Sequence, residues 1–168
     1  VLGIVGFGRV GKLVAERAKA FGMDILVFDP LALEETAREM GVMLVEMDEL
    51  LSQSDYITLH AALNPSTTKL INADTIAQMK DGVILINAAR GKLLDEAAVA
   101  EGLKSGKIKA AAIDVYSSEP PPADHPLLGL PNVVHVPHLG ASTHEAERDV
   151  GLKIVGQVVN ALRGTDYT

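Results

Sequence analysis

The chain has 168 residues, no cysteine and a formal net charge of −7, and it is long enough to form one domain with an apolar core. The absence of thiols excludes disulfides, cysteine-bound zinc and a thiol nucleophile, and it favours a reducing, cytoplasmic setting. The acidic balance and an aromatic content of 4% argue against nucleic-acid binding. No apolar run approaches membrane-spanning length, so we expect no membrane partner.

Short apolar runs alternate with amphipathic segments along the chain. The runs are nearly continuous, which is typical of strands covered on both faces of a parallel sheet. They predict strands at Val1–Val5, Ile25–Phe28, Val42–Val45 (the weakest), Tyr56–Leu59, Val83–Ile86, Ala110–Ile113 and Val133–Val136. Because strand and helix signals alternate, the sequence predicts a three-layer α/β/α domain with a doubly wound parallel sheet over residues 1–168.

The segments between these runs predict helices. The first has an apolar stripe closed by Gly22, and capping residues indicate where three later helices begin. The stripe is Val10, Leu13, Val14, Ala18 and Phe21; the caps are Asp48 before Glu49–Ser52, Asn72 before Ala73–Met79, and Asp95 before a helix that stops at Gly106. Between the last two strands, Tyr116–Asn132 holds five of the eight prolines and predicts a stiff, shaped loop, with His125 as a loop residue.

The last predicted helix covers residues 143–163. Ser142–Glu145 is interpreted as a capping box, and apolar residues then recur at a spacing of four until Gly164. These residues are Val150, Ile154, Val158 and Leu162, with Val155 and Val159 alongside. A helix of this length spans roughly 30 Å.

Gly6, Gly8 and Gly11 form the pattern G-x-G-x-x-G between the first predicted strand and the first predicted helix. Gly6 allows a tight turn, Gly8 lets the backbone approach a pyrophosphate, and Gly11 lets the helix pack closely. The helix N-terminus offers unpaired N–H groups to phosphates, and Arg9 adds a local positive charge. The pattern therefore predicts a dinucleotide-binding Rossmann fold.

Asp29 ends the second predicted strand and is followed by Pro30 and Leu31. A carboxylate at this position accepts hydrogen bonds from ribose hydroxyls and repels a 2′-phosphate. No Arg or Lys follows it directly, so the sequence predicts NAD rather than NADP as the cofactor. The alternative is an acid that only opens a turn before proline.

Polar residues follow the predicted strands at the edge where open α/β sheets bind ligands. Arg90 lies there between two small residues, and its guanidinium can bind a carboxylate bidentately and polarise a carbonyl. Taken alone, Arg90 would be interpreted as a surface residue in a turn, but its small neighbours on both sides suggest close approach of a ligand. The other polar residues at these strand ends are Asp29, His60, Asn87, Asp114 and His138. Together they predict a site at this edge.

His138 is the candidate proton acceptor, because an alcohol that gives up a hydride must also lose its hydroxyl proton. A carboxylate would orient its ring, and Glu119 on the proline-rich loop is the candidate, with a solvated loop acid as an even alternative. Asp114 could accept a hydrogen bond from a nicotinamide carboxamide. His135 lies three residues before His138, but Pro137 bars a helix between them, so no metal site is predicted.

Several stretches resemble the D-2-hydroxyacid dehydrogenase family, in the order in which the family has them. They are Gly6–Gly11, Phe28–Pro30, Asn64–Thr68, Ile86–Gly91, Asp114–Tyr116 with Glu119–Pro120, and Pro137–Thr143. They cover almost the whole chain and are jointly specific. The resemblance implies an NAD-dependent oxidoreductase that transfers a hydride between a small 2-hydroxy acid and the cofactor.

The resemblance also implies a role for each matching residue. Arg90 would bind the substrate carboxylate and carbonyl, and Glu119 and His138 would form the acid–base pair. Asp29 would hold the adenosine ribose. The other cofactor contacts would come from Gly6, Gly8, Arg9, Val10, Gly11, His60, Ala61, Thr67, Ala88, Ala89, Asp114, Gly140 and Ala141.

The chain departs from the family pattern at one point. Where the family commonly has His-x-Pro-Leu, Ala62 replaces the proline of His60–Leu63, so we expect a softer loop that still binds the cofactor. The stretch His138–Thr143 favours the branch that acts on 3-phosphoglycerate, the first step of serine biosynthesis. The alternatives are a hydroxypyruvate or glyoxylate reductase and an NAD-sensing, corepressor-like interaction protein.

The family's full chain has a second domain for the substrate, built from segments before and after the cofactor domain. Because Val1 already lies in a predicted strand, we expect this chain to be the cofactor domain, with the helix over 143–163 leading back to the substrate domain. Such a piece should bind NAD and, alone, turn over little or nothing. The resemblance also implies a homodimer through this domain, or a higher homo-oligomer.

Overall fold

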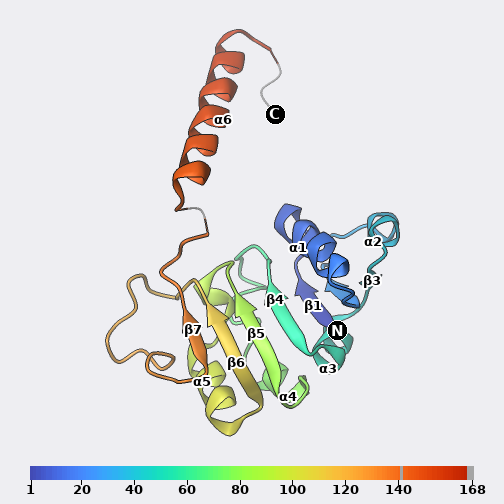
Figure 1. Ribbon diagram of the computed structural model, residues 1–168, viewed down its shortest axis with the longest axis vertical. Coiled ribbons are helices and arrows are strands. Elements are labelled where there is room, and N and C mark those ends of the chain that lie inside the picture. The colour runs from blue at the N-terminus through green and yellow to red at the C-terminus, as the bar shows by residue number, and fades with distance from the viewer. Residues whose placement is uncertain (141, 166–168) are drawn as a thin grey trace. The chain divides into compact units, whose positions relative to one another are not determined.

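A computed structural model describes residues 1–140 and 142–165 of the chain (Figure 1). The chain forms two compact units, Val1–Val136 and Pro137–Thr168, and each is described by itself. Ala141, one of the predicted cofactor residues, lies outside the described residues.

The first unit is built on a parallel sheet that, in the described part of the chain, has seven strands in the order β3-β2-β1-β4-β5-β6-β7. The strands are β1 (Leu2–Val5), β2 (Ile25–Phe28), β3 (Met43–Leu44), β4 (Tyr56–Leu59), β5 (Val83–Asn87), β6 (Ile108–Ile113) and β7 (Val133–His135). Each predicted strand is present, and the doubly wound parallel sheet is confirmed. The strand order reverses between β1 and β4, and such a switch point is where open α/β sheets bind their ligands.

Five α-helices of the first unit connect these strands. They are α1 (Arg9–Ala20), α2 (Glu34–Met40), α3 (Met47–Gln53), α4 (Ala73–Gln78) and α5 (Glu96–Ser105), with a short 3₁₀ turn, η1, at Gly91–Leu93. The caps at Asn72 and Asp95 are confirmed, because their side chains accept backbone N–H groups of the first turns of α4 and α5. The cap predicted at Asp48 is wrong, because α3 begins after Glu46 and Asp48 lies within its first turn. The positive end of the helix dipole stabilises an acidic side chain at that position.

The apolar runs are explained by burial on alternate faces of the strands. Ile4 and Val27 pack toward α1 and α2, whereas Val5 and Leu26 belong to the cluster that contains α3, α4 and α5. The two clusters put a layer of helices on each side of the sheet.

The first predicted helix packs through a face that overlaps the predicted stripe only in part, at Ala18, which is buried, and Val14, which packs against the same cluster. Its buried residues are Gly11, Ala15 and Ala18, whereas three members of the predicted stripe are at least half exposed. Those three are Val10, Leu13 and Phe21. The prediction followed the largest apolar side chains, but close packing of a helix on a sheet is made here by the smallest ones.

The described part of the second unit contains helix α6 (His144–Leu162), which confirms the long helix. Its N-cap is Thr143, whose side chain accepts the N–H of Ala146 at 3.1 Å, so the predicted capping box begins one residue too early. The third helical residue is therefore Ala146 rather than Glu145, and the reciprocal bond of a capping box has no carboxylate to make it. None of the helices that the structure describes has both the length and the apolar content needed to cross a membrane.

Candidate functional site

The glycine pattern forms the turn between β1 and α1. Gly6 has φ +96°, and a Cβ there would lie 2.5 Å from the backbone nitrogen of Ala61, so only glycine fits between this turn and the end of β4. At Gly8, which precedes α1, a Cβ would meet nothing within 4 Å. Arg9 and Val10 are exposed in the first turn of the helix. This open, backbone-lined helix N-terminus suits an anionic group.

Asp29 is held against the glycine turn. Its carboxylate accepts the N–H of Phe7 at 2.7 Å and the N–H of Leu31 at 2.8 Å. A carboxylate can accept about four hydrogen bonds, so these two fix its position and leave acceptor capacity for further donors. The structure thus brings together the two parts of the predicted dinucleotide site at the ends of β1 and β2.

His60 directly follows β4 and is half-buried. Its Nε2 lies 3.0 Å from the hydroxyl oxygen of Thr58, a buried residue of the same strand. Burial lowers the pKa of the His60 ring from its ordinary value. His60 therefore presents a neutral ring at pH 7, next to Ala61 and the glycine turn.

The loop after His60 is held by its own side chains. Asn64 accepts the N–H groups of Ser66 and Thr67 on its side-chain oxygen, and the hydroxyl of Thr67 donates to the carbonyl of Ala62 at 2.8 Å. These hydrogen bonds lie where the family's proline is missing. The softer loop stays a prediction, but the hydroxyl of Thr67, a predicted cofactor residue, is engaged within the loop itself.

Arg90 lies in a turn that is closed by Asn87, the fully buried last residue of β5. The Asn87 side chain donates to the carbonyl of Arg90 at 3.0 Å and accepts the N–H of Ala89 at 3.1 Å. Arg90 is exposed, and its guanidinium donates to the carbonyl of Ala89 at 2.6 Å. Ala88 is exposed beside it. Sequence reasoning noted Asn87 only as a strand-end residue and missed that it shapes the Arg90 turn.

The turn that carries Arg90 touches the loop that carries Glu119. A Cβ on Gly91 would lie 1.9 Å from the carbonyl carbon of Tyr116, so the backbone of that loop passes directly over Gly91. Buried Asp114 donates its N–H to the carbonyl of Asn87 at 3.0 Å and joins the ends of β6 and β5. Glu119 is exposed, and its Oε1 accepts the N–H of Tyr116 at 3.1 Å.

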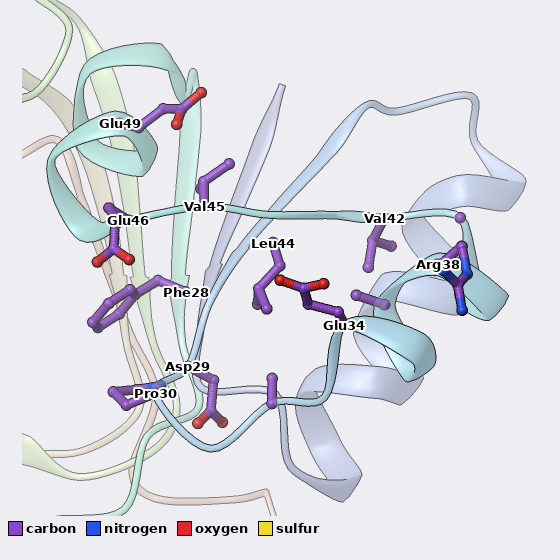
Figure 2. A pocket seen from close by; sticks show the side chains of 13 residues that line it. Phe28, Asp29, Pro30, Glu34, Arg38, Val42, Leu44, Val45, Glu46 and Glu49 are labelled. Carbon is purple, nitrogen blue, oxygen red and sulfur yellow. The ribbon is translucent and has the colours of Figure 1, made fainter.

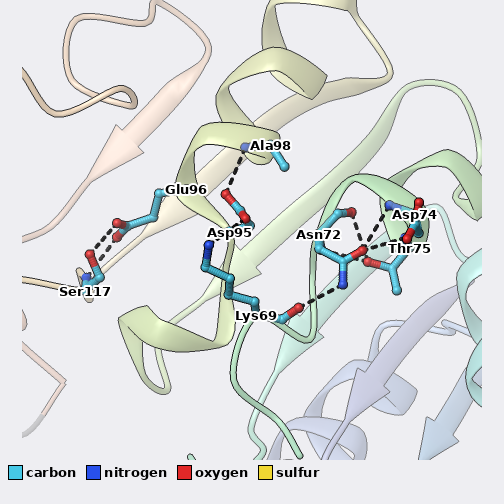
Figure 3. Close-up of polar contacts among 8 residues, drawn as sticks. All are labelled: Lys69, Asn72, Asp74, Thr75, Asp95, Glu96, Ala98 and Ser117. Carbon is cyan, nitrogen blue, oxygen red and sulfur yellow. Dashed lines mark hydrogen bonds and ion pairs between the residues drawn. The ribbon is translucent and has the colours of Figure 1, made fainter.

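A buried polar group lies at the start of the proline-rich loop. Glu96 accepts the backbone N–H of Ser117 at 2.8 Å, and its second oxygen lies 3.0 Å from Nε2 of His125 (Figure 3 shows the contact with Ser117). The Tyr116 hydroxyl lies 2.6 Å from Nδ1 of His135. Burial, together with the charges of Glu96 and of an aspartate nearby, raises the pKa of Tyr116. His125 lies in this loop, as predicted, and its side chain is only 4% exposed.

The segment after Arg90 also contacts the end of the loop that follows His60. Lys69 donates its N–H to the carbonyl of Lys92 at 2.8 Å, and its ammonium lies 2.9 Å from the Asp95 carboxylate (Figure 3). Ile71 donates to the carbonyl of Leu93 at 3.0 Å. Residues 91–96 therefore contact both the loop with Thr67 and the loop with Glu119.

His138 and Gly140 belong to the second unit, Pro137–Thr168. His138 has a left-handed backbone, with φ +53°, and its carbonyl accepts the hydroxyl of Ser142 at 3.4 Å. Pairing of His138 with Glu119 stays a prediction.

A cavity of about 970 Å³ lies between β2, α2, β3 and α3 (Figure 2). Acidic side chains line much of it: Asp29, Glu34, Glu46 and Glu49. Of the predicted cofactor residues it includes only Asp29, so the cavity adjoins the site at the carboxyl ends of the strands and is not that site. Among the described residues, no group of three His, Asp or Glu side chains is arranged to hold a metal ion.

Comparison with known proteins establishes the family. Residues 1–140 match the family described as D-isomer specific 2-hydroxyacid dehydrogenase, NAD binding domain. The chain belongs to this family. It is 50% identical over 162 residues to D-3-phosphoglycerate dehydrogenase of Archaeoglobus fulgidus, and the alignment covers 96% of this chain and 31% of that protein. It is 48% identical over 163 residues to hydroxypyruvate reductase of Thermotoga maritima, and the alignment covers 96% of this chain and 52% of that protein.

Solved structures give the same family. A glyoxylate reductase from Paecilomyes thermophila superposes with a TM-score of 0.88 at 41% identity, covering 95% of this chain and 48% of that one. A D-lactate dehydrogenase with NAD+ from Lactobacillus jensenii superposes with a TM-score of 0.90 at 31% identity, and the match covers 99% of this chain and 53% of that one. The chain thus spans from about a third to about half of the length of these relatives.

The residues present fit NAD, the cofactor of this family. The open space at Gly8, in front of the N-terminus of α1, matches a pyrophosphate, and the fixed Asp29 carboxylate matches ribose hydroxyls. Gly6 and Gly11 keep the turn tight, and the neutral ring of His60 flanks it. Arg90 and Glu119 lie beyond these groups, on the loops after β5 and β6.

A titration of the histidine rings by NMR tests the environment of His60. Because burial favours the neutral ring, His60 should titrate below the ordinary value of 6.5. The folded state then binds this proton less readily than the unfolded chain, so the contribution of His60 to stability is present above pH 6.5 and is lost as the pH falls below it. A His60 pKa at or above the ordinary value of 6.5 would contradict this environment.

Proposed function

We propose that this chain is the cofactor domain of an NAD-dependent D-2-hydroxyacid dehydrogenase whose substrate is 3-phosphoglycerate. The observation that carries the proposal is the contact between the turn with Arg90 and the loop with Glu119, at the sheet edge that also holds the glycine turn and Asp29. A carboxylate-binding cation and an acid–base carboxylate thereby follow neighbouring strands on the cofactor side of the sheet. The family motifs around these residues support the same roles.

The proposed chemistry assigns one task to each group. The glycine turn and Asp29 would hold NAD, which would supply the acceptor for the hydride that leaves C2 of the 2-hydroxy acid. The Arg90 guanidinium binds the substrate carboxylate and, as the ketone forms, the C2 oxygen. The hydroxyl proton passes to the ring of His138, and the Glu119 carboxylate orients that ring and stabilises its charged form.

The substrate is the finer part of the proposal. Relatives named D-3-phosphoglycerate dehydrogenase and hydroxypyruvate reductase have almost the same identity to this chain, 50% and 48%. The stretch His138–Thr143 supports 3-phosphoglycerate, and reduction of hydroxypyruvate or glyoxylate is the second candidate. We further propose a cytoplasmic enzyme that assembles as a homodimer through this domain, as the family resemblance implies.

Replacing Asp29 by Ala tests the cofactor preference. The variant should bind NAD roughly 10- to 100-fold more weakly, because hydrogen bonds to a charged group contribute about 1.5–3 kcal/mol. Its discrimination against NADP should also relax, since the charge that repels a 2′-phosphate is gone. Calorimetric titration with both cofactors measures this, and Glu49→Ala, which removes an equal charge from the neighbouring cavity, is the control. An unchanged preference for NAD in Asp29→Ala would refute the assignment.

Replacing His138 by Ala in the complete enzyme tests the proton transfer. Loss of a general base should lower kcat by roughly 10²- to 10⁴-fold while the Kd for NAD stays near that of the wild type. Nicotinamide absorbance with 3-phosphoglycerate, hydroxypyruvate and glyoxylate measures kcat and ranks the substrates. His144→Ala, at an exposed position, should keep wild-type kcat. Undiminished turnover by His138→Ala would rule out this role.

A further inference from the structure

We infer that Glu96 is a positioning residue that fixes the loop carrying Glu119 beside Arg90, acting through Ser117 and His125. This inference rests on the proposed function, because it gives Glu96 a part in the placement of the acid–base carboxylate. Neither the family resemblance nor the sequence pattern singled out Glu96, which was expected only as part of a helix.

Glu96 is a nearly buried acid whose two oxygens both contact the proline-rich loop. Its side chain is 11% exposed. Oε1 accepts the backbone N–H of Ser117 at 2.8 Å, and Oε2 accepts the hydroxyl of Ser117 (Figure 3). Oε2 also lies 3.0 Å from Nε2 of His125. Glu96 is also the first residue of α5, where the helix dipole favours a negative charge. The carboxylate is therefore stabilised in a place where an unpaired charge would be costly.

His125 supports this arrangement from within the loop. Its Nδ1 accepts the N–H of Leu127 at 3.3 Å, so a neutral ring carries its proton on Nε2, the atom that faces Glu96. Nε2 lies 3.0 Å from Oε2 of Glu96 without meeting the geometry of a regular hydrogen bond, so its N–H dipole is close to the carboxylate charge. The ring also packs edge-on against Tyr116, with 5.2 Å between the centroids. Both Ser117 and a residue well along the loop are thus attached to one carboxylate.

The contact between Glu96 and Ser117 matters because it lies between the two proposed catalytic groups, Glu119 and Arg90. Ser117 is two residues from Glu119, whose carboxylate is tied to the N–H of Tyr116. Gly91, which follows Arg90 directly, lies against the same Tyr116–Ser117 backbone. One short segment, residues 91–96, therefore fixes the Glu119 loop at one end and continues from the Arg90 turn at the other. The side chain of Glu96 sets the distance between two groups that must act on the same substrate.

Loss of the hydrogen bonds between Glu96 and Ser117 should misplace Glu119 without disturbing the dinucleotide site. The glycine turn and Asp29 lie at the ends of β1 and β2, away from α5 in the strand order. A misplacement of about 1 Å in a catalytic group can cost roughly 100-fold in rate. The expected signature of Glu96→Ala is a loss in kcat at unchanged affinity for NAD.

The test compares variants of the complete enzyme by steady-state kinetics and NAD titration. Glu96→Ala should lower kcat roughly 10- to 100-fold and keep the Kd for NAD within about twofold. Glu96→Gln, which keeps an acceptor for the Ser117 N–H, should recover most of this loss. Glu101→Ala, on the exposed side of the same helix, should have wild-type kcat.

A double-mutant cycle separates positioning from plain structural support. If Glu96 acts through Glu119, then Glu96→Ala should have almost no further effect in a Glu119→Gln background. An equal fold loss in both backgrounds, or an unchanged kcat in Glu96→Ala alone, would overturn the inference. If Glu96→Ala does not fold, Glu96→Asp decides: the shorter side chain withdraws the carboxylate from Ser117, so kcat should fall in the same direction, and wild-type kcat would overturn the inference. A wild-type enzyme without turnover on any 2-hydroxy or 2-oxo acid would instead refute the proposed function, and the inference with it.

Discussion

Direct contact between backbones is the constraint on which the site depends. At Gly91 the turn after β5 lies against the loop after β6, and at Gly6 the turn after β1 lies against the residues that follow β4. Any Cβ at either position would collide with backbone atoms, which cannot move aside as a flexible side chain can. These two contacts bring the loops with Arg90 and Glu119 together and seat the glycine turn next to His60. The side-chain contacts at this edge of the sheet form between loops that these two backbone contacts already hold in place.

Local charge reconciles an acidic chain with an anionic cofactor. The net charge is −7, and the cavity beside β2 is lined with glutamates. At the carboxyl edge of the sheet, however, the N-terminus of α1, Arg9 and Arg90 supply positive potential. Coulomb attraction depends on the groups within a few ångströms more than on distant exposed charges, which salt screens. The acidic surface therefore leaves the proposed pyrophosphate and carboxylate positions attractive to anions.

The strands and the glycine turn could be predicted from the sequence because their signals are local. A strand buried on both faces needs a continuous apolar run, and a tight turn beside another backbone needs glycine. The packed face of α1 and the role of His125 could not be predicted in this way. Ala15 packs on the sheet because it is small, and the buried His125 contacts Glu96, which is distant from it in the sequence. Such pairings follow from the tertiary fold, which places α5 against the loop after β6.

The assigned residue roles all depend on NAD binding at the carboxyl edge of the sheet. The most direct test is to add NAD+ to the ¹⁵N-labelled 168-residue chain and to map the amide shifts by NMR. We expect shifts at Gly8, Phe7 and Ala61, around the glycine turn and the end of β4, with little change at Arg38, Val42 and Glu49 in the neighbouring cavity. Shifts centred on those cavity residues, or no shifts at the glycine turn at saturating NAD+, would contradict this placement of NAD.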